Sequence, residues 1–473
     1  MTGNHAMTRT IGVLALARPT FDVDFARSRT ELAFRRLDAT GERIVGPREL
    51  LFDADAASKA LQSLPLADLD RLIILQVTFT DASMTTKIAT EVAAPLAIWA
   101  LPEPRIGGRL RLNAYCGLNL AAHALRLVDA EFSYLYADPS SETCAHDLAA
   151  LLAGERRRAP VKATKPSVDA CDRAIAERVV ERLSTMRIAR IGEHPDGFHT
   201  CAYNADALRC LTGIEVDRLD LDDLFARAER VLDDDVARTR SLAACEMVGL
   251  DDLDQDELDK SLRLKNALDD LHTQGGYDAF AIRCWPETFT EYGGAVCGPV
   301  AMMGERRVPC ACEADVFGAL TGLVLQELAG APAFQVDLVD VDRLDGTSVV
   351  WHCGQAPISM ADPQSEPRAT VHTNRRKPLL YEFALKPGRV TFARFSQSEG
   401  RIRLMIAGGE MLRRPKAFTG TSGVVAYDAP VDRLEATIMG AGLEHHSSLV
   451  YGDYRSQLRA IAERLSIEVI EIA

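Results

Sequence analysis

The feature that most constrains the fold is an alternation of short apolar runs with helical patterns. Residues 10–16 (TIGVLAL), 71–77 (RLIILQV) and 95–101 form runs of buried-strand length. A helical pattern covers residues 21–37, and another helix is predicted to begin near Ala82. Strands and helices that alternate in this way indicate a parallel sheet with helices on both faces.

Two changes of pattern divide the chain into three predicted domains. Residues 154–166 (GERRRAPVKATKP) lack apolar periodicity and contain two prolines, which is typical of an interdomain linker. The alternation restarts after this linker. From about Ala369, short β-type runs are separated by the hairpin turns KPGR and SQSEG. We therefore predict two α/β domains, residues 1–165 and 166–355, and a smaller antiparallel β-rich, barrel-like domain, residues 356–473.

Charge and hydropathy exclude several classes of partner. A chain of 473 residues is too long for a single core. Its net charge of -14 argues against a nucleic-acid partner, since no basic face is present to neutralise phosphates. A membrane partner is not expected, because no run of about 18 apolar residues occurs. The first ten residues do not resemble a secretory signal, and the 11 cysteines show no framework spacing, so we expect a cytoplasmic protein with reduced thiols.

Two predicted loops of the first domain carry candidate substrate contacts. In parallel sheets, ligands bind beyond the carboxyl ends of the strands. The sequence TFTDASM places Asp81 in such a loop, and PEPRIGGRLRLN places Arg105 and Asn113 in another. The alternative for all three side chains is ordinary turn formation and helix capping. Neither loop contains a phosphate-binding glycine motif, so no nucleotide site is predicted.

A second candidate site lies between two predicted elements of the second domain. An apolar strand-like run, residues 277–283, stops at Trp285-Pro286-Glu287, because proline cannot donate to a strand ladder. Glu313 and Asp315 open the apolar helical run 316–328. Carboxylates at a strand end and at a helix entrance are expected to converge on a divalent cation. The alternative is a surface glutamate and an acid favoured by the helix dipole. We also assign Trp285 to the predicted substrate-binding set.

Histidines follow two further predicted elements. His352 ends the apolar strand within residues 347–354, and His445-His446 is an adjacent pair before another apolar run. Imidazoles in such positions are either metal ligands or ordinary polar groups, and the residues alone leave both alternatives open.

Four motifs resemble a known family. The sequences CWPE, CEADVFGALT, WHCG and GLEHHSSLVYGDY occur in the order found in the L-fucose and L-arabinose isomerase superfamily. They look especially like the bacterial L-fucose isomerase-like branch, as do the two loops of the first domain. This resemblance implies two Rossmann-like domains followed by a domain with antiparallel β-structure. It also implies a homo-oligomer with active sites near subunit interfaces, and aldose–ketose isomerisation of a sugar with manganese or another divalent cation such as magnesium or cobalt.

The resemblance also implies roles for individual residues. Glu287, Asp315 and His446 match the metal ligands of the family, and Glu313 replaces Asp315 if the helix register differs by half a turn. His352 resembles a ligand histidine of the arabinose branch that the fucose branch lacks, so we assign it to metal or to a sugar hydroxyl.

The predicted reaction moves a carbonyl group between C1 and C2 of a free sugar through a cis-enediolate. A metal stabilises the charge that develops on the oxygens, while a carboxylate transfers the proton. We assign Glu287 and Asp315 as the base and acid pair. The alternatives are an epimerase or an isomerase of a modified sugar on the same scaffold, and a non-catalytic sugar-binding protein.

Overall fold

The computed structural model describes residues 8–155, 161–165 and 168–473. These residues group into two units. Unit 1 contains Met1–Pro104, Leu110–Pro160 and Ile438–Leu443, and unit 2 contains Arg105–Arg109, Val161–Thr437 and Glu444–Ala473. Residues 156–160 and 166 of the predicted linker and the first seven residues of the chain lie outside the described residues.

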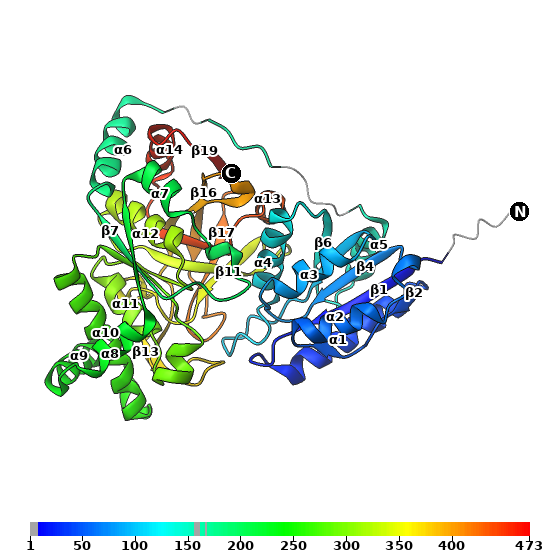
Figure 1. Ribbon diagram of the computed structural model, residues 1–473, viewed down its shortest axis with the longest axis horizontal. Coiled ribbons are helices and arrows are strands. Elements are labelled where there is room, and N and C mark those ends of the chain that lie inside the picture. Colours follow the sequence, from blue (N-terminus) through cyan, green and yellow to red (C-terminus); the bar gives the residue numbers. More distant parts are fainter. Residues whose placement is uncertain (1–7, 156–160, 166–167) are drawn as a thin grey trace, which may run out of the picture. The chain divides into compact units, whose positions relative to one another are not determined.

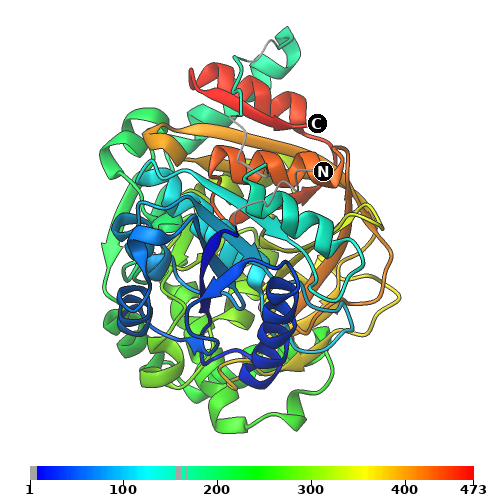
Figure 2. The same ribbon diagram turned by 90° about the vertical axis from the view of Figure 1, so that its right-hand side faces the viewer.

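Unit 1 is built on a parallel sheet with the strand order β2-β1-β4-β5-β6, and the short β3 pairs with the end of β1 (Figure 1). Its strands are β1 (Thr10–Leu16), β2 (Arg43–Val45), β3 (Leu50–Leu51), β4 (Arg71–Gln76), β5 (Leu96–Ala100) and β6 (Phe132–Tyr136). Its helices are α1 (Val23–Asp38), α2 (Ala54–Gln62), α3 (Ser83–Glu91), α4 (Ala114–Leu127) and α5 (Cys144–Ala153). Figure 2 shows helices on both faces of this sheet, as the alternating pattern predicts.

Unit 2 begins with a second parallel sheet, of order β10-β9-β7-β8. Its strands are β7 (Arg187–Ile191), β8 (Glu215–Leu219), β9 (Ala279–Ile282) and β10 (Cys310–Cys312). The helices of this part are α6 (Ala170–Leu183), α7 (Ala205–Thr212), α8 (Leu221–Glu229), α9 (Asp233–Glu246), α10 (Gln255–Gly275), α11 (Cys297–Glu305) and α12 (Val316–Ala329).

The rest of unit 2 is a closed antiparallel barrel. Its strands are β11 (Phe334–Asp342), β12 (Thr347–His352), β15 (Gly388–Ser396), β16 (Arg403–Leu412), β17 (Thr421–Tyr427) and β18 (His446–Tyr451). The ring runs β17-β12-β11-β18-β15-β16, and the pairing of β16 with β17 closes it. Strands β13 (Arg368–Thr370), β14 (Leu380–Ala384) and β19 (Glu468–Ile472) extend the sheet beyond the ring. Helix α14 (Arg455–Arg464) belongs to unit 2, whereas α13 (Val431–Ala441) is divided between the two units.

Helix α12 joins the parallel sheet and the barrel of unit 2. Its residues from Val316 to Gln326 are buried on every face, which is expected of a helix inside a core. One hydrophobic cluster contains α12 together with Ala281 of β9, Phe395 of β15 and Ile406 of β16. The first turn of α12 is thereby fixed against both the parallel sheet and the barrel.

The predicted fold class is confirmed: parallel α/β sheets precede a larger, mostly antiparallel C-terminal sheet. Strands β11 and β12, which lie before the predicted boundary at residue 356, belong to the barrel that the later strands complete. The division into three domains stays a prediction. Among the residues that the structure describes, no helix combines the length and the apolar character needed to cross a bilayer.

A buried carboxylate organises one of the two predicted substrate loops. Glu103 accepts hydrogen bonds from the backbone N–H groups of Arg111, Leu112 and Asn113, at 2.5, 2.8 and 2.8 Å. Asn113 itself has a φ of 50° and lies at the N-cap of α4. Because an ionised carboxylate is acceptor-only, it can satisfy three converging donors at once. Glu103 therefore holds the loop in shape just before α4.

Glu103→Ala is expected to lower the free energy of unfolding by about 3 kcal/mol, since it leaves buried N–H groups without an acceptor. Urea denaturation followed by circular dichroism measures this loss. Glu91→Ala, a change at an exposed carboxylate, is the control and should change stability by no more than about 0.5 kcal/mol. Equal effects of the two substitutions would contradict the role given to Glu103.

Candidate metal centre

Glu313 is presented by a tight turn between β10 and α12. The φ angles of Glu313 and Ala314 are 60° and 55°, in the left-handed region that L-residues rarely occupy and that recurs at functional sites. The Glu313 Oε2 atom lies 3.0 Å from His445 Nε2 and 3.7 Å from His446 Nε2. The Oε1 atom accepts a hydrogen bond of 3.0 Å from Trp285 Nε1. The turn thus brings this carboxylate to the start of β18.

Asp315 is the N-cap of α12, and both of its oxygens are engaged. The Oδ1 atom accepts a hydrogen bond from the backbone of Gly318 at 2.9 Å. The Oδ2 atom faces the Arg394 guanidinium, Gln335 Nε2 at 3.1 Å and His446 Nδ1 at 2.9 Å. Burial raises the pKa of Asp315, but the charge of Arg394 and the contact with His446 outweigh it, so the pKa is lowered. Asp315 is therefore ionised.

This ionised Asp315 determines the tautomer of His446. Because a carboxylate only accepts hydrogen bonds, the short contact requires a proton on His446 Nδ1. The lone pair of the neutral ring is then on Nε2, the atom that faces Glu313. Burial lowers the pKa of His446, and the neighbouring His445 lowers it further. A neutral imidazole oriented by a carboxylate is the form in which histidine binds metals.

Strand pairing brings Asp337 and His352 close to His446. In the register of β11 with β18, Asp337 lies directly opposite His446. The Asp337 Oδ1 atom lies 3.5 Å from His446 Nε2 and makes no hydrogen bond. The Nε2 atom of His352, at the end of β12, is also buried without a hydrogen-bond partner. Ligand atoms of Asp337, His352 and His446 lie within 4.8 Å of one another.

The hydrogen bond of the other ring nitrogen of His352 restricts what Nε2 can do. Its Nδ1 atom accepts a hydrogen bond of 2.9 Å from the backbone N–H of Cys353. Burial lowers the pKa of His352, but the neighbouring Cys353 and Asp337 outweigh burial and raise it to about 9. Both the protonated ring and a neutral ring that accepts at Nδ1 carry a proton on Nε2. The geometry consequently favours His352 as a donor to an oxygen atom over His352 as a metal ligand.

His445 and Glu313 form an ion pair beside His446. Burial raises the pKa of Glu313, but the hydrogen bond with His445 outweighs burial and lowers it overall. Burial lowers the pKa of His445, and the hydrogen bond with Glu313 raises it above its usual value. The two adjacent histidines thus have opposite tendencies: the pKa of His445 is raised and that of His446 is lowered.

The donor atoms fit a hard divalent cation. Carboxylate oxygens with one imidazole suit manganese, magnesium or cobalt, as the sequence predicts. The Cys201 thiol also belongs to the group formed with Glu313, His445 and His446. Burial and the nearby carboxylates raise the pKa of Cys201, which keeps it a thiol and a poor ligand. A cation at this point would give a partner to the buried Oδ1 atom of Asp337, which makes no hydrogen bond.

Glu287 and Trp285 follow β9, as predicted. Trp285 donates to Glu313, whereas Glu287 is paired with an arginine. Arg283 binds both oxygens of Glu287, at 2.8 and 2.7 Å, and this contact lowers the pKa of Glu287. Among the described residues, the groups of mutually close ligand atoms include Glu313 and His446 but not Glu287. A role for Glu287 as ligand or base stays a prediction, and it requires the carboxylate to leave Arg283.

The predicted residues of the first loops lie in two different units. In unit 1, Asp81 forms an ion pair of 2.6 Å with Arg18, and the Asn113 Oδ1 atom is buried without a hydrogen bond. In unit 2, Arg105 donates to Asp340 at 2.5 Å and to Thr347 Oγ1 at 2.8 Å, on the barrel. Their assignment to the substrate stays a prediction.

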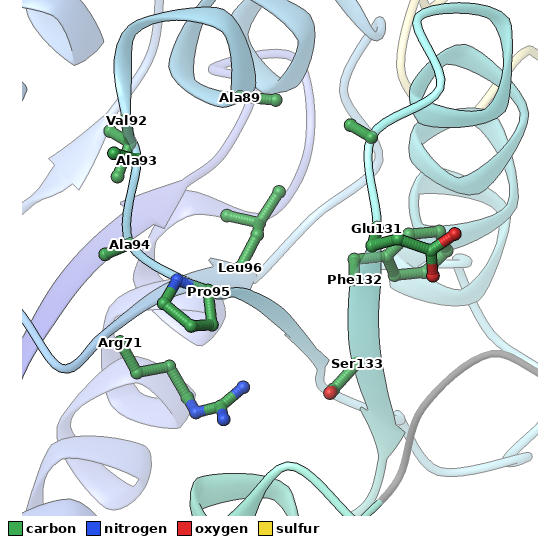
Figure 3. Close-up of a pocket in the computed structure, with 11 residues that line it drawn as sticks. Arg71, Ala89, Val92, Ala93, Ala94, Pro95, Leu96, Glu131, Phe132 and Ser133 are labelled. Carbon is green, nitrogen blue, oxygen red and sulfur yellow. The ribbon is translucent and has the colours of Figure 1, made fainter.

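Unit 1 contains a cavity at the end of its sheet where the strands begin. It has a volume of about 420 Å³ and lies at the amino ends of β4, β5 and β6. Figure 3 shows Arg71 on one side of it and Glu131, Phe132 and Ser133 on the other. Ligands of parallel sheets bind at the carboxyl ends of strands, where Asp81 lies, so this cavity is not a candidate for the substrate site.

Sequence reasoning missed Asp337 and Arg394 at the centre and treated Glu313 only as an alternative to Asp315. The alternating sequence FQVDLVDVD marks Asp337 as an acid within a strand, but the partner opposite it depends on the register with β18. Arg394 lies within the run RVTFARFS of β15, and its exposure is 1%. A cation in a buried strand position is a signal that a carboxylate faces it.

Comparisons with known proteins match almost the whole chain. A family model described as "Fucose/sulfoquinovose isomerase, N-terminal domain" matches residues 12–162, and one described as "L-fucose isomerase, C-terminal domain" matches residues 350–473. A sulfoquinovose isomerase of Clostridium sp. (strain MSTE9) is 31% identical over 97% of this chain and 98% of its own length. The sulfoquinovose isomerases of Priestia megaterium and Alkalicoccus urumqiensis are 28% and 29% identical, over 97% and 98% of this chain and 98% and 99% of their own lengths.

One solved structure, a galactofuranose binding protein, aligns with 68% of this chain and 90% of its own at 10% identity and a TM-score of 0.18, too low a similarity to carry an argument. The near full-length matches confirm the resemblance to the L-fucose isomerase-like branch. The chain belongs to the fucose/sulfoquinovose isomerase family and is an aldose–ketose isomerase.

Proposed function

We propose that this isomerase acts on sulfoquinovose and depends on a divalent metal bound at His446. The relatives named above are sulfoquinovose isomerases and match this chain over almost its whole length. The observation that carries the metal proposal is the convergence of His446 Nε2, Glu313 Oε2 and the unpaired Asp337 Oδ1. The modified sugar, which sequence analysis gave as an alternative, thus becomes the proposed substrate.

The geometry favours a ligand set of Glu313, Asp337 and His446. Asp315, assigned as a ligand from its motif, is better placed to orient His446, because its oxygens are occupied by Arg394 and by the helix N-terminus. The motif-based set, taken from the family motifs, consists of Glu287, Asp315 and His446. It requires Glu287 to separate from Arg283. Both sets contain His446, and they differ in the carboxylates that hold the ion.

When bound, a divalent metal held by these residues would polarise the sugar carbonyl and offset the negative charge that develops during the reaction. The protein then has to move one proton between C1 and C2. Glu313 is ionised and in contact with His445, which makes it a candidate for that transfer. Glu287 is the other candidate, from its motif. The Nε2–H group of His352 is placed to donate to a sugar oxygen.

Removing the metal is expected to abolish the reaction. Protein treated with EDTA should incorporate no deuterium at C1 or C2 of sulfoquinovose in deuterium oxide, and manganese should restore incorporation, both followed by proton NMR. The same assay with a panel of other aldoses tests which sugar is the substrate. Full turnover by protein shown to be free of metal by mass spectrometry would contradict the metal proposal, and turnover of another aldose alone would contradict the substrate.

The same substitution at two glutamates separates the two ligand sets. Glu313→Gln should weaken manganese binding at least about tenfold, since it removes a charged oxygen that faces the ion. Glu287→Gln, whose partner is Arg283, should retain the metal. Equilibrium dialysis with manganese gives both affinities. The reverse pattern would favour the motif-based set.

Exchange of the C2 proton tests which glutamate is the base. In manganese-loaded Glu287→Gln, loss of exchange with deuterium oxide is expected if Glu287 carries the proton. Normal exchange in this variant would remove Glu287 from the proton transfer and leave the role to Glu313.

A further inference from the structure

We propose that Arg375 binds the sulfonate group of the substrate, with Trp285 between it and the metal centre. This inference rests on the proposed function, because it names the part of the site that recognises the modified end of the sugar. The sulfonate of sulfoquinovose is on the carbon farthest from the aldehyde. A site that holds the aldehyde end at the metal therefore needs a cation beyond the metal centre.

Trp285 connects the centre with Arg375. Its indole N–H donates to Glu313 Oε1 at 3.0 Å. The guanidinium carbon of Arg375 lies 5.5 Å from the centroid of the Trp285 ring. Phe198, which is fully buried, packs edge-to-face on Trp285 with ring centroids 5.2 Å apart. The indole is thus fixed at one end by the metal centre and carries a cation on its face.

The loop that carries Arg375 is held in shape by its own contacts. His372 Nδ1 accepts hydrogen bonds of 3.2 Å from the backbone N–H groups of Asn374 and Arg375. Arg109 Nε donates to Asn374 Oδ1 at 2.9 Å. The ring of His372 packs edge-to-face on Phe289, with centroids 5.1 Å apart. The position of Arg375 is therefore set before a ligand arrives, which lowers the entropy cost of binding.

Arg375 and Arg376 are adjacent in the loop but differ in their surroundings. Arg376 is exposed. Arg375 is half-buried over an aromatic face that touches the metal centre. A planar guanidinium donates several N–H groups in a fixed fork, which suits a tetrahedral oxyanion.

A sulfonate and a phosphate share this oxyanion chemistry, so the experiment compares both. Steady-state kinetics with manganese-loaded protein should use sulfoquinovose, glucose 6-phosphate and glucose. Arg375→Ala is expected to raise KM for sulfoquinovose about 10- to 100-fold, as befits the loss of hydrogen bonds to a charged group, with a much smaller change in kcat. Arg375→Lys should recover part of the loss. The ratio of kcat/KM for sulfoquinovose to that for glucose should fall with the Ala variant.

Arg376→Ala is the matched control, since it removes a neighbouring charge of the same loop. It should leave KM for sulfoquinovose within about twofold, a free-energy change under about 0.5 kcal/mol. Metal content and thermal unfolding of each variant show whether the centre and the fold are intact. Equal losses for sulfoquinovose and glucose, or no loss in Arg375→Ala, would overturn the proposal, and a larger loss for glucose 6-phosphate would assign the site to a phosphate.

Binding measured without turnover separates this proposal from the proposed function. Calorimetric titration of sulfoquinovose into EDTA-treated protein reports affinity alone. If the wild type binds the sugar without converting it, and Arg375→Ala weakens binding, Arg375 keeps its role and the proposed reaction fails. If the wild type converts sulfoquinovose and Arg375→Ala binds it equally well, the reaction stands and the role of Arg375 fails.

Discussion

The contact between Asp315 and His446 determines how the imidazole of the candidate metal centre is oriented. Its length of 2.9 Å, with an ionised carboxylate as acceptor, places the imidazole proton on Nδ1 and leaves Nε2 toward Glu313 and Asp337. Asp315 is itself held by Arg394, and the exposure of both side chains is 1%. Breaking such a buried ion pair costs about 3 to 5 kcal/mol, because one charge is left without a partner. The orientation of His446 is thus tied to the stability of the core.

Two parts of the fold bring these groups together. Helix α12 lies between the parallel sheet and the barrel, which fixes the N-cap residue Asp315 and the left-handed turn before it. The barrel places Asp337 opposite His446 through the register of β11 with β18, and Arg394 comes from β15, the strand on the other side of β18. The candidate metal centre is thereby built on rigid elements, with Glu313 at a strained backbone position that the packed surroundings maintain.

Local patterns in the sequence predicted most elements, because they depend on neighbouring residues. The apolar run 10–16 corresponds to β1, and the run 316–328 corresponds to α12. Closure of the barrel was beyond local patterns, since β11 and β12 join strands that follow far later in the chain. At the site, Asp315 and His446 were expected to converge, and the structure brings them into contact. Glu287 forms a local ion pair with Arg283 four residues earlier, and Asp337 is identified only by strand register.

Anomalous scattering from a crystal of the manganese-loaded protein tests the metal centre most directly. The predicted result is a single manganese peak bonded to His446 Nε2 and to oxygens of Glu313 and Asp337, with the contact between Asp315 and His446 Nδ1 intact. A manganese peak that does not touch His446, or one that binds Asp315 after its separation from Arg394, would contradict the central role of the Asp315–His446 contact.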